Sequence, residues 1–262
     1  NRIFNWVRPC RLSIKLVITI DICCGYVYLR MADTADEEEP LASSAKDLAR
    51  QQKERAYASL IEVHPTSVGK MVSRKEREAR RLRSQDMTYG EIKFTSFGTI
   101  FSWIRERLGE LQDPGGVFYD LGSGTGKPVF AAALLHDFDR CVGIELLEGL
   151  HACALELQTR WDAMKTADPP TLKSSEQRTA IELINGDITT DEWSDATFVF
   201  TNSTCFTSQL MRELAELSLE LKPGALWVSF TRELPSEEWE LLLSEQLAMS
   251  WGPATIYIQR RR

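Results

Sequence analysis

The sequence has few of the residues that build metal or disulfide sites. Six cysteines and three histidines occur among 262 residues, and no two cysteines have the CxxC spacing that is typical of zinc sites. Disulfide frameworks belong mainly to much smaller secreted chains. We therefore expect no metal ion, and we interpret the cysteines as reduced thiols, with Cys141 and Cys153 in the core.

The chain also lacks a net positive charge, since 31 basic residues stand against 38 acidic ones and the formal charge is −7. This excludes a uniformly basic nucleic-acid binder. The basic residues are nevertheless concentrated, because residues 61–83 hold seven basic and three acidic side chains. The segment Lys70–Arg83 is therefore suited to DNA phosphates or to an acidic protein patch, and it resembles a nuclear-import signal. The alternative is a solvated helix face.

No uninterrupted apolar run is long enough to span a membrane. Residues 12–29 are mostly apolar, but a lysine and an aspartate interrupt them, and charge within such a run is costly in lipid. We interpret residues 1–43 as an N-terminal extension that is disordered or artefactual. Residues 1–30 fit translated upstream or artefactual sequence, a targeting segment or a structured extension, whereas the acidic residues 32–43 fit disorder. We expect no membrane association.

The rest of the chain divides by its periodicity. Residues 44–112 are helical in pattern, with expected helices at 44–60, 70–86 and 95–111. Within residues 113–262, short apolar segments alternate with helical ones. That alternation predicts an α/β fold with a mostly parallel sheet and helices on both faces. The expected strands are residues 117–121, 141–146, 181–184, 197–201 and 225–230, and the expected helices between and after them are 128–135, 148–161, 208–221 and 236–243.

The end of the chain departs from this alternation. Residues 247–251 and 255–259 are strand-like and flank Gly252–Pro253. We therefore predict a terminal strand pair, with at least one strand antiparallel to the rest of the sheet.

A glycine-rich turn is the strongest motif. Asp120 ends the first expected strand, and glycines follow at every second position, 122, 124 and 126. Glycine permits positive φ and a close approach of the backbone to a ligand. A helix is expected near Pro128, so the turn lies at the carboxyl edge of a parallel sheet, where open α/β folds bind ligands.

Three classes of ligand compete for this turn. A P-loop requires GxxxxGK[ST], but Leu121 stands at the first glycine position and Pro128 at the Ser/Thr position. A dinucleotide fold requires GxGxxG, whereas the third glycine here comes one residue early. The third class is S-adenosylmethionine, whose cationic methionine end suits an acid at the position of Asp120.

Acceptor side chains follow the later strands in the same way. Glu145 ends the second expected strand, where a carboxylate can accept both hydroxyls of a ribose. Asp187 follows the third strand and suits an adenine amino group, with Ile188 packing on the ring. Asn202 ends the fourth. Each of these residues alone could be a solvated loop side chain or a helix cap. Four acceptors at four successive strand ends together favour a site for S-adenosylmethionine.

The chain resembles the class I S-adenosylmethionine-dependent methyltransferases, and among them the DOT1-like histone lysine methyltransferases. Tyr89-Gly90-Glu91 is similar to the family's YGE segment, which covers the cofactor. Residues 118–127 resemble its FxDLGSGxGQ turn, with Lys127 in place of glutamine. The resemblance extends over about residues 86–259.

Later motifs support the same resemblance. Residues 186–193 are similar to the family's GDFxxxxW stretch, and residues 199–203 to its IFVNN segment, with Ser203 in place of the second asparagine. Trp251 and Tyr257 match its late VSW…Y pattern. Thr204 stands where the family has a phenylalanine in the lysine channel, which leaves the identity of the substrate more open than that of the cofactor.

The resemblance implies a Rossmann-like class I methyltransferase domain at residues 113–262, preceded by the helical segment with its basic stretch and cofactor-covering loop. It places Asn202 at the methyl-transfer point and Trp251 and Tyr257 on the walls of a lysine channel; the alternative for the two aromatics is packing within the terminal strands. The implied cofactor-binding residues are Tyr89, Gly90, Glu91, Phe118, Asp120, Gly122, Ser123, Gly124, Thr125, Gly126, Lys127, Glu145, Asp187 and Ile188.

The function implied is S-adenosylmethionine-dependent methylation of a protein lysine, with a histone in nucleosomes as the favoured substrate and the nucleus as the favoured location. The cytoplasm is the alternative location. Methylation of a non-histone protein or a small molecule is the alternative activity. A catalytically silent binding module is a third possibility, although such a module has no need of all four acceptors.

Overall fold

The computed structural model describes residues 19–23, 26–30, 39–82, 89–168, 171–249 and 252–262. The chain divides into two compact units, residues 1–49 and 50–262. In the first unit, strands β1 (Thr19–Cys23) and β2 (Tyr26–Arg30) form an antiparallel pair. Helix α1 (Glu39–Ile61) begins in this unit, within the segment that we assigned to the N-terminal extension, and ends in the second.

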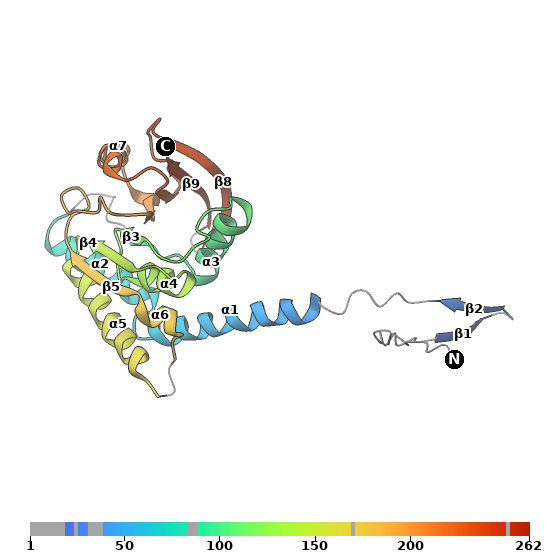
Figure 1. Cartoon of the computed structure of the whole chain (residues 1–262). Helices are drawn as coiled ribbons and strands as arrows, with labels where there is room; N and C mark the ends of the chain where they lie inside the picture. Colours follow the sequence, from blue (N-terminus) through green and yellow to red (C-terminus); the bar gives the residue numbers. More distant parts are fainter. Residues whose placement is uncertain (1–18, 24–25, 31–38, 83–88, 169–170, 250–251) are drawn as a thin grey trace, which may run out of the picture. The chain divides into compact units, whose positions relative to one another are not determined.

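The second unit contains a seven-stranded sheet in the order β5-β4-β3-β6-β7-β9-β8 (Figure 1). Strands β3 to β7 pair in parallel, whereas β9 is antiparallel to both β7 and β8. This confirms the predicted mostly parallel sheet with an antiparallel C-terminal strand. The strands are β3 (Val117–Leu121), β4 (Arg140–Glu145), β5 (Ala180–Asn185), β6 (Phe198–Thr201), β7 (Leu226–Phe230), β8 (Trp239–Met249) and β9 (Gly252–Arg261).

Helices precede and connect these strands. The predicted helix at 70–86 corresponds to α2, which ends at Ala79, and the predicted helix at 95–111 is divided into an α-helical and a π-helical part. No helix in the described ranges is both long and apolar enough to cross a bilayer. After α1, the helical elements are α2 (Thr66–Ala79), α3 (Phe94–Ser102), η2 (Trp103–Arg107), α4 (Lys127–Leu135), α5 (Glu148–Thr166), α6 (Ser174–Arg178), η3 (Ser203–Cys205), α7 (Ser208–Leu217) and η4 (Ser218–Glu220).

Side chains that alternate along the strands divide the core into two faces. On one face, Phe118 and Phe198 pack with residues of α1, α3, α4 and α5. On the other, Tyr119 and Val199 pack with Leu214 and its neighbours in α7. Figure 1 shows α7 on one side of the sheet and α4 and α5 on the other, so the expected helices on both faces are present.

The predicted helix at residues 236–243 is wrong, because strand β8 begins at Trp239. Glutamate and leucine favour a helix locally, but β8 pairs with β9 from Trp239 opposite Arg261 onward. A register shift between Leu241 and Leu243 disturbs the alternation that marks a strand in sequence. Pairing with β9 therefore outweighs local helix propensity.

The predicted antiparallel pair at the end of the chain is confirmed by β8 and β9. Its Gly252–Pro253 dipeptide lies within β9, opposite residues 248–249 of β8, and does not form the connection. Residues 250–251 lie outside the described residues.

The order of the strands determines where a ligand can bind. The chain moves outward from β3 through β4 to β5, then returns to the other side of β3 at β6. At such a reversal the connections leave in opposite directions, and a crevice opens beyond the carboxyl ends of the strands.

Candidate functional site

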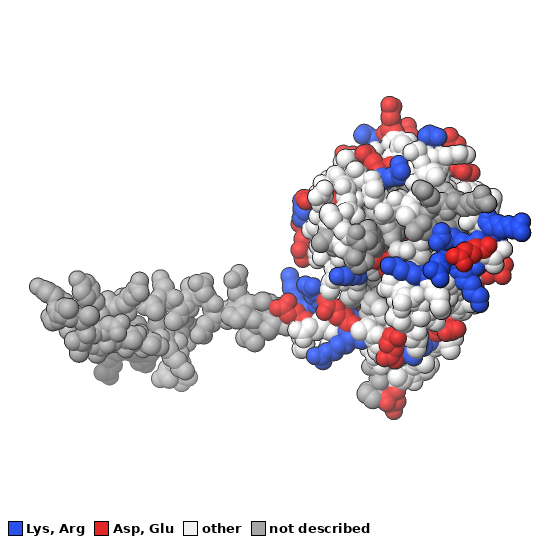
Figure 2. Space-filling view, turned by 180° about the vertical axis from the view of Figure 1, so that it is seen from behind, with Lys and Arg blue, Asp and Glu red and all other residues white. Residues whose placement is uncertain are grey.

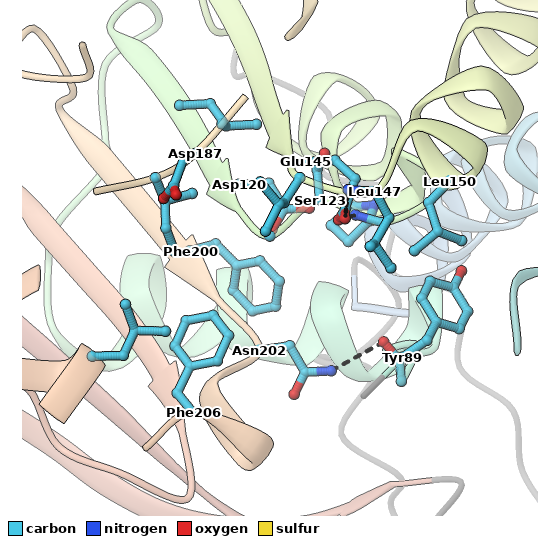
Figure 3. A pocket seen from close by; sticks show the side chains of 18 of the residues that line it. Tyr89, Asp120, Ser123, Glu145, Leu147, Leu150, Asp187, Phe200, Asn202 and Phe206 are labelled. Carbon is cyan, nitrogen blue, oxygen red and sulfur yellow. Dashed lines mark hydrogen bonds between the residues drawn. The ribbon is translucent and has the colours of Figure 1, made fainter. Parts of the chain in front are cut away.

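A cavity of about 470 Å³ lies at this edge of the sheet, a size typical of small-molecule sites. Figure 3 shows side chains from several strand ends and from the segment at Tyr89 converging on it. The structure thereby brings together most of the residues that we predicted. Those that line the cavity are Tyr89, Gly90, Glu91, Asp120, Gly122, Ser123, Gly124, Thr125, Lys127, Glu145, Asp187, Ile188 and Asn202.

The glycine-rich turn after β3 forms the floor between β3 and β4. The amides of Gly122 and Ser123 both donate to the carbonyl of Ile144, at 3.0 and 2.9 Å, and tie the turn to β4. Gly124 has a φ of +57°, and a Cβ there would meet the ring of Tyr89 at 2.6 Å. A side chain at residue 124 is therefore excluded both by backbone conformation and by space.

Two buried carboxylates face each other at the ends of β3 and β4. Glu145 accepts the amide of Gly124 at 2.7 Å and that of Leu147 at 2.8 Å. Asp120 is 1% exposed, and its Oδ2 accepts no hydrogen bond within the described part of the chain. The site therefore holds one carboxylate that accepts hydrogen bonds from the backbone and one with a buried oxygen that lacks a hydrogen-bond partner among the described residues.

The electrostatics of this pair favour a cationic ligand. Burial, followed by the nearby charge of Glu145, raises the pKa of Asp120 well above its usual value. Burial also raises the pKa of Glu145, and the backbone amides of Leu147 and Gly124 oppose that shift. A cation beside Asp120 would stabilise its charged form. Binding of an ammonium group would therefore offset the unfavourable effects of burial and of the nearby Glu145 charge.

The segment before α3 is fastened over the cavity by a buried ion pair. Lys127 donates to Glu91 with Nζ and Oε1 2.7 Å apart, and the two side chains are only 4% and 13% exposed. Tyr89 donates its phenolic hydrogen to the same oxygen of Glu91, and its hydroxyl lies 2.8 Å from that of Thr125. Burial and the charge of Glu91 raise the pKa of Tyr89, which therefore remains a donor.

Helix α2 supports the same segment from outside. Its first residue, Thr66, donates to Oε2 of Glu91 at 2.5 Å. Further along, Gly69 lies so close to the ring of Tyr89 that a Cβ would meet it at 2.4 Å. The position of the covering segment therefore depends on α2 as well as on Lys127.

Asp187 is held in a tight turn after β5. One of its carboxylate oxygens, Oδ1, accepts both the amide of Thr189 at 2.9 Å and its hydroxyl at 2.8 Å. The carbonyl of Ile188 accepts the indole hydrogen of Trp193 at 2.9 Å, and Trp193 is buried in the core. These hydrogen bonds hold the backbone on both sides of Ile188, whose side chain lines the cavity.

Asn202 follows β6 directly and lines the opposite side of the cavity (Figure 3). Its Nδ2 donates to the carbonyl of Gly90 at 3.2 Å. Its Oδ1 accepts the hydroxyl of Thr204 at 3.0 Å. The residue thus connects the end of β6 to the covering segment.

Two predicted cofactor contacts do not line the cavity. Phe118 is fully buried, with its ring 5.5 Å from that of Phe198 and 5.6 Å from that of Phe138. It shares a face of β3 with Asp120 but lies two residues deeper in the sheet. Gly126 is the N-cap residue of α4, and a Cβ there would meet Ala154 at 3.0 Å, so the glycine permits close packing of α4 on α5.

Of the two predicted lysine-channel residues, the described part of the chain includes Tyr257 alone. Trp251 lies outside the described residues. Tyr257 is half-buried in β9, opposite Ser229 and Ser244, and does not line the cavity. Strand β7 separates β9, which carries Tyr257, from β6 at the cavity. The role of Tyr257 as a channel wall therefore stays a prediction.

The apolar part of the lining was missed in the sequence analysis. Phe200 comes from β6, Phe206 and Leu210 from the segment after it, and Leu147 and Leu150 from the beginning of α5. In sequence these residues have the pattern of ordinary core positions. Their proximity to Glu145 and Asn202 along the chain was the available signal.

The cavity fits S-adenosylmethionine. The roles of the individual residues stay predictions: Asp120 for the ammonium group, Glu145 for the ribose hydroxyls and Ile188 for the adenine. The apolar lining suits the uncharged parts of the same molecule. Among the described residues, no three His, Cys, Asp or Glu side chains are grouped as a metal site requires.

A sheet in this order, with a glycine turn after its first parallel strand and an acid after its second, defines a class I methyltransferase fold. The family described as "Histone methylation protein DOT1" matches residues 72–245. The chain belongs to this DOT1 family.

Curated relatives occur in two strains of Cryptococcus neoformans var. neoformans serotype D, JEC21 and B-3501A. Both are named "Histone-lysine N-methyltransferase, H3 lysine-79 specific". Each is 30% identical over 181 residues, which make up 66% of this chain and 24% of the relative. The chain thus spans about a quarter of the length of these relatives.

Solved structures are also similar to parts of this chain. An RNA methyltransferase from Salinibacter ruber, in complex with S-adenosyl-L-homocysteine, is 22% identical with a TM-score of 0.44, over 62% of this chain and 90% of that one. TrmN from Thermus thermophilus is 12% identical with a TM-score of 0.48, over 65% and 52%.

Proposed function

We propose that this chain is an S-adenosylmethionine-dependent protein lysine N-methyltransferase that acts on a histone lysine in nucleosomes, in the nucleus. The observation that carries the proposal is one cavity lined both by Asp120, a buried carboxylate with an oxygen that lacks a hydrogen-bond partner among the described residues, and by the neutral amide of Asn202. Membership of the DOT1 family and the names of the Cryptococcus relatives support a histone substrate.

The reaction requires alignment and a neutral amine. When bound, S-adenosylmethionine supplies a methyl group on a sulfonium, whose sulfur departs as a neutral thioether with the electron pair of the broken bond. The amine nitrogen of the lysine forms the new bond to carbon, and the product amine releases a proton to water. A free lysine has a pKa near 10.4, so presenting it neutral at pH 7 costs about 4–5 kcal/mol.

The residues around the cavity meet this requirement without a dedicated base. The rings of Phe200 and Phe206 and the side chain of Leu210 exclude water, and desolvation lowers the pKa of an amine. The carbonyl of Asn202 has a second lone pair with which it would accept an amine hydrogen. Because an amide carries no charge, it would hold the amine without favouring its protonated form.

The basic helix α2 supports a nucleosomal partner. Lys70, Arg74 and Lys75 are exposed, and so are Arg80 and Arg81 beyond its end. Figure 2 shows Lys and Arg gathered over the side of the molecule where α2 lies. We propose that this surface contacts nucleosomal DNA, since DNA phosphates attract exposed basic groups.

Incubation of the full chain with methyl-labelled S-adenosylmethionine tests the activity. Nucleosomes, free histones and a whole-cell protein extract serve as parallel substrates, and Asp120→Asn is the control. We expect label on nucleosomal histone that the Asp120→Asn variant lacks.

Other distributions of label would contradict the proposal in identifiable ways. Label on another extract protein alone, or on a small molecule, would overturn the histone substrate and leave methyl transfer intact. Binding of S-adenosylmethionine without transfer to any of these substrates would instead indicate a silent module.

A further inference from the structure

The loop after β6 is anchored by side-chain hydrogen bonds to the strands on both sides of it. Ser203 is fully buried, and its hydroxyl donates to the carbonyl of Phe230 at 2.8 Å and accepts the amide of the same residue at 3.2 Å. Thr201, just before the loop, donates to the carbonyl of Leu121 at 3.1 Å. The backbone on which Asn202 stands is therefore held to both neighbouring strands, β3 and β7.

Two hydrogen bonds of opposite polarity then determine how the amide of Asn202 points. The carbonyl of Gly90 is an acceptor only, so the group of Asn202 that faces it is the amino group. The carbonyl oxygen of Asn202 must then face Thr204, whose hydroxyl donates to it at 3.0 Å. Thr204 therefore satisfies one lone pair of that oxygen and leaves the other for a ligand.

We infer that Thr204 is a positioning residue for methyl transfer: it holds the carbonyl of Asn202 in the orientation that accepts the substrate amine. This inference rests on the proposed function, because it assigns a reacting partner to Asn202. Thr204 itself touches neither substrate nor cofactor in this scheme and acts through the amide.

Thr231, which directly follows β7, lies beside Thr204 and supports this arrangement. Its φ is +67°, a left-handed conformation that is costly for a β-branched residue. Its amide donates to the carbonyl of Thr255 at 2.7 Å, and its hydroxyl lies 3.4 Å from that of Thr204, a long contact. The strained backbone thus places a second hydroxyl beside Thr204, where it limits the directions in which the Thr204 hydroxyl can turn.

Paired substitutions at residue 204 provide the first test. Thr204→Val keeps the shape of the side chain and removes the hydroxyl, whereas Thr204→Ser keeps the hydroxyl. We expect kcat for the methylated substrate to fall about tenfold in Thr204→Val, the effect of removing one hydrogen bond, and to recover in Thr204→Ser. The affinity for S-adenosylhomocysteine should be unchanged in both, and equal kcat values for the two variants would overturn the inference.

A double-mutant cycle separates positioning from a general structural role. If Thr204 acts through Asn202, then Thr204→Val should reduce kcat in the native background but not in the Asn202→Ala background. Additive losses would show that Thr204 acts independently of the amide and would overturn the inference.

The orientation of the amide can be observed without any activity. The side-chain NH₂ signals of Asn202 in a ¹⁵N-labelled full chain, assigned by their loss in Asn202→Asp, should shift in Thr204→Val and remain in place in Thr204→Ser. Signals that do not respond to Thr204→Val would overturn the inference even if the enzyme is active. A wild-type chain that methylates no substrate would overturn the proposed function, while these signals would still decide whether Thr204 positions Asn202.

We expect Thr231→Gly to preserve or raise stability but to lower activity. Glycine tolerates the left-handed backbone, so we expect a thermal midpoint equal to or above that of the native chain. Loss of the neighbouring hydroxyl should still lower kcat, by less than in Thr204→Val. A variant that is more stable with unchanged kcat would remove Thr231 from the arrangement.

Discussion

Asp120 combines complete burial with a carboxylate oxygen that no described residue satisfies, and its raised pKa has a measurable consequence. A cationic ligand binds the charged carboxylate. We therefore predict that affinity for S-adenosylhomocysteine, which retains the ammonium group, weakens as pH falls below the pKa of free Asp120 and strengthens as pH rises through it. Titration calorimetry between about pH 5 and 9 measures this dependence.

Asp120→Asn is the matched control, since it removes the charge and keeps the shape. The variant should bind the ligand weakly, with a much flatter pH profile. Because burial raises the folded pKa, the charged carboxyl costs stability above its unfolded pKa of about 3.9, so the unliganded variant should also be more stable at neutral pH. An unchanged pH profile in the variant would assign the titration to another group.

Lys127 forms a buried ion pair with Glu91, and this pair should contribute to the stability of the fold. We predict that Lys127→Met lowers the free energy of unfolding by about 3 kcal/mol, because it leaves a buried carboxylate without its cation. The double variant Lys127→Met with Glu91→Gln should recover most of the loss. Urea unfolding followed by tryptophan fluorescence measures both.

The exposed pair Arg74–Glu78 provides the comparison, since its side chains are 74% and 70% exposed. Arg74→Met should change the free energy of unfolding by no more than about 0.5 kcal/mol. A loss in Lys127→Met as small as this, or a double variant no better than the single one, would show that the pair does not stabilise the fold.

Among the elements, α2 is fastened to α5 through one side chain. The carboxylate of Glu76 accepts hydrogen bonds from the first backbone amides of α5, those of Gly149 at 2.8 Å and Glu148 at 3.0 Å. It also accepts a hydrogen bond from the guanidinium of Arg80 at 2.9 Å. Burial alone would raise the pKa of Glu76, but these hydrogen bonds outweigh burial and lower it. One helix thereby caps the N-terminus of another, directly beside the cavity residue Leu147.

We predict that Glu76→Ala costs about 1–2 kcal/mol at neutral pH, the usual value of an N-cap. Because the folded pKa is lowered, this stabilisation is present above the unfolded pKa of about 4.3 and disappears as pH falls through the folded value. Chemical denaturation at several pH values measures it. Glu78→Ala, on the same helix but exposed, should have little effect at any pH, and equal losses in the two variants would refute the capping role.

At the scale of the whole molecule, a chain with a net charge of −7 carries a basic surface on and just beyond α2. We predict that replacing Lys70, Arg74 and Lys75 with glutamine weakens binding to nucleosomal DNA. The dependence of affinity on salt should become shallower by about 0.9 in log–log slope for each DNA phosphate that the protein no longer neutralises. Fluorescence anisotropy with labelled duplex DNA over a range of salt concentrations measures both effects.

A charge-matched control is available elsewhere on the surface. Replacing the exposed residues Arg178, Arg212 and Lys222 with glutamine changes the net charge equally but leaves α2 intact. Equal weakening by both sets would mean that net charge alone governs binding. Weakening of histone binding with unchanged DNA binding would point to an acidic protein surface as the partner of α2.

Features that depend on neighbouring residues could be predicted from the amino-acid sequence. The parallel strands, the glycine turn, and the acceptors Asp120, Glu145, Asp187 and Asn202 at successive strand ends were all readable, because a strand end and its following turn are encoded locally. Their meeting in one cavity followed from the topology of a parallel sheet, whose carboxyl ends share an edge. The cofactor half of the site was therefore predictable.

Features that depend on contacts between residues distant in the chain became visible only in the folded molecule. Strand β8 exists because β9 pairs with it, Phe118 is core because α3 and β6 enclose it, and Lys127 is an ion-pair partner because Glu91 is brought to it. The orientation of Asn202 likewise depends on Gly90, more than a hundred residues earlier. Local propensity and spacing carry no record of such contacts, because their energies arise only when the folded chain brings the two partners together.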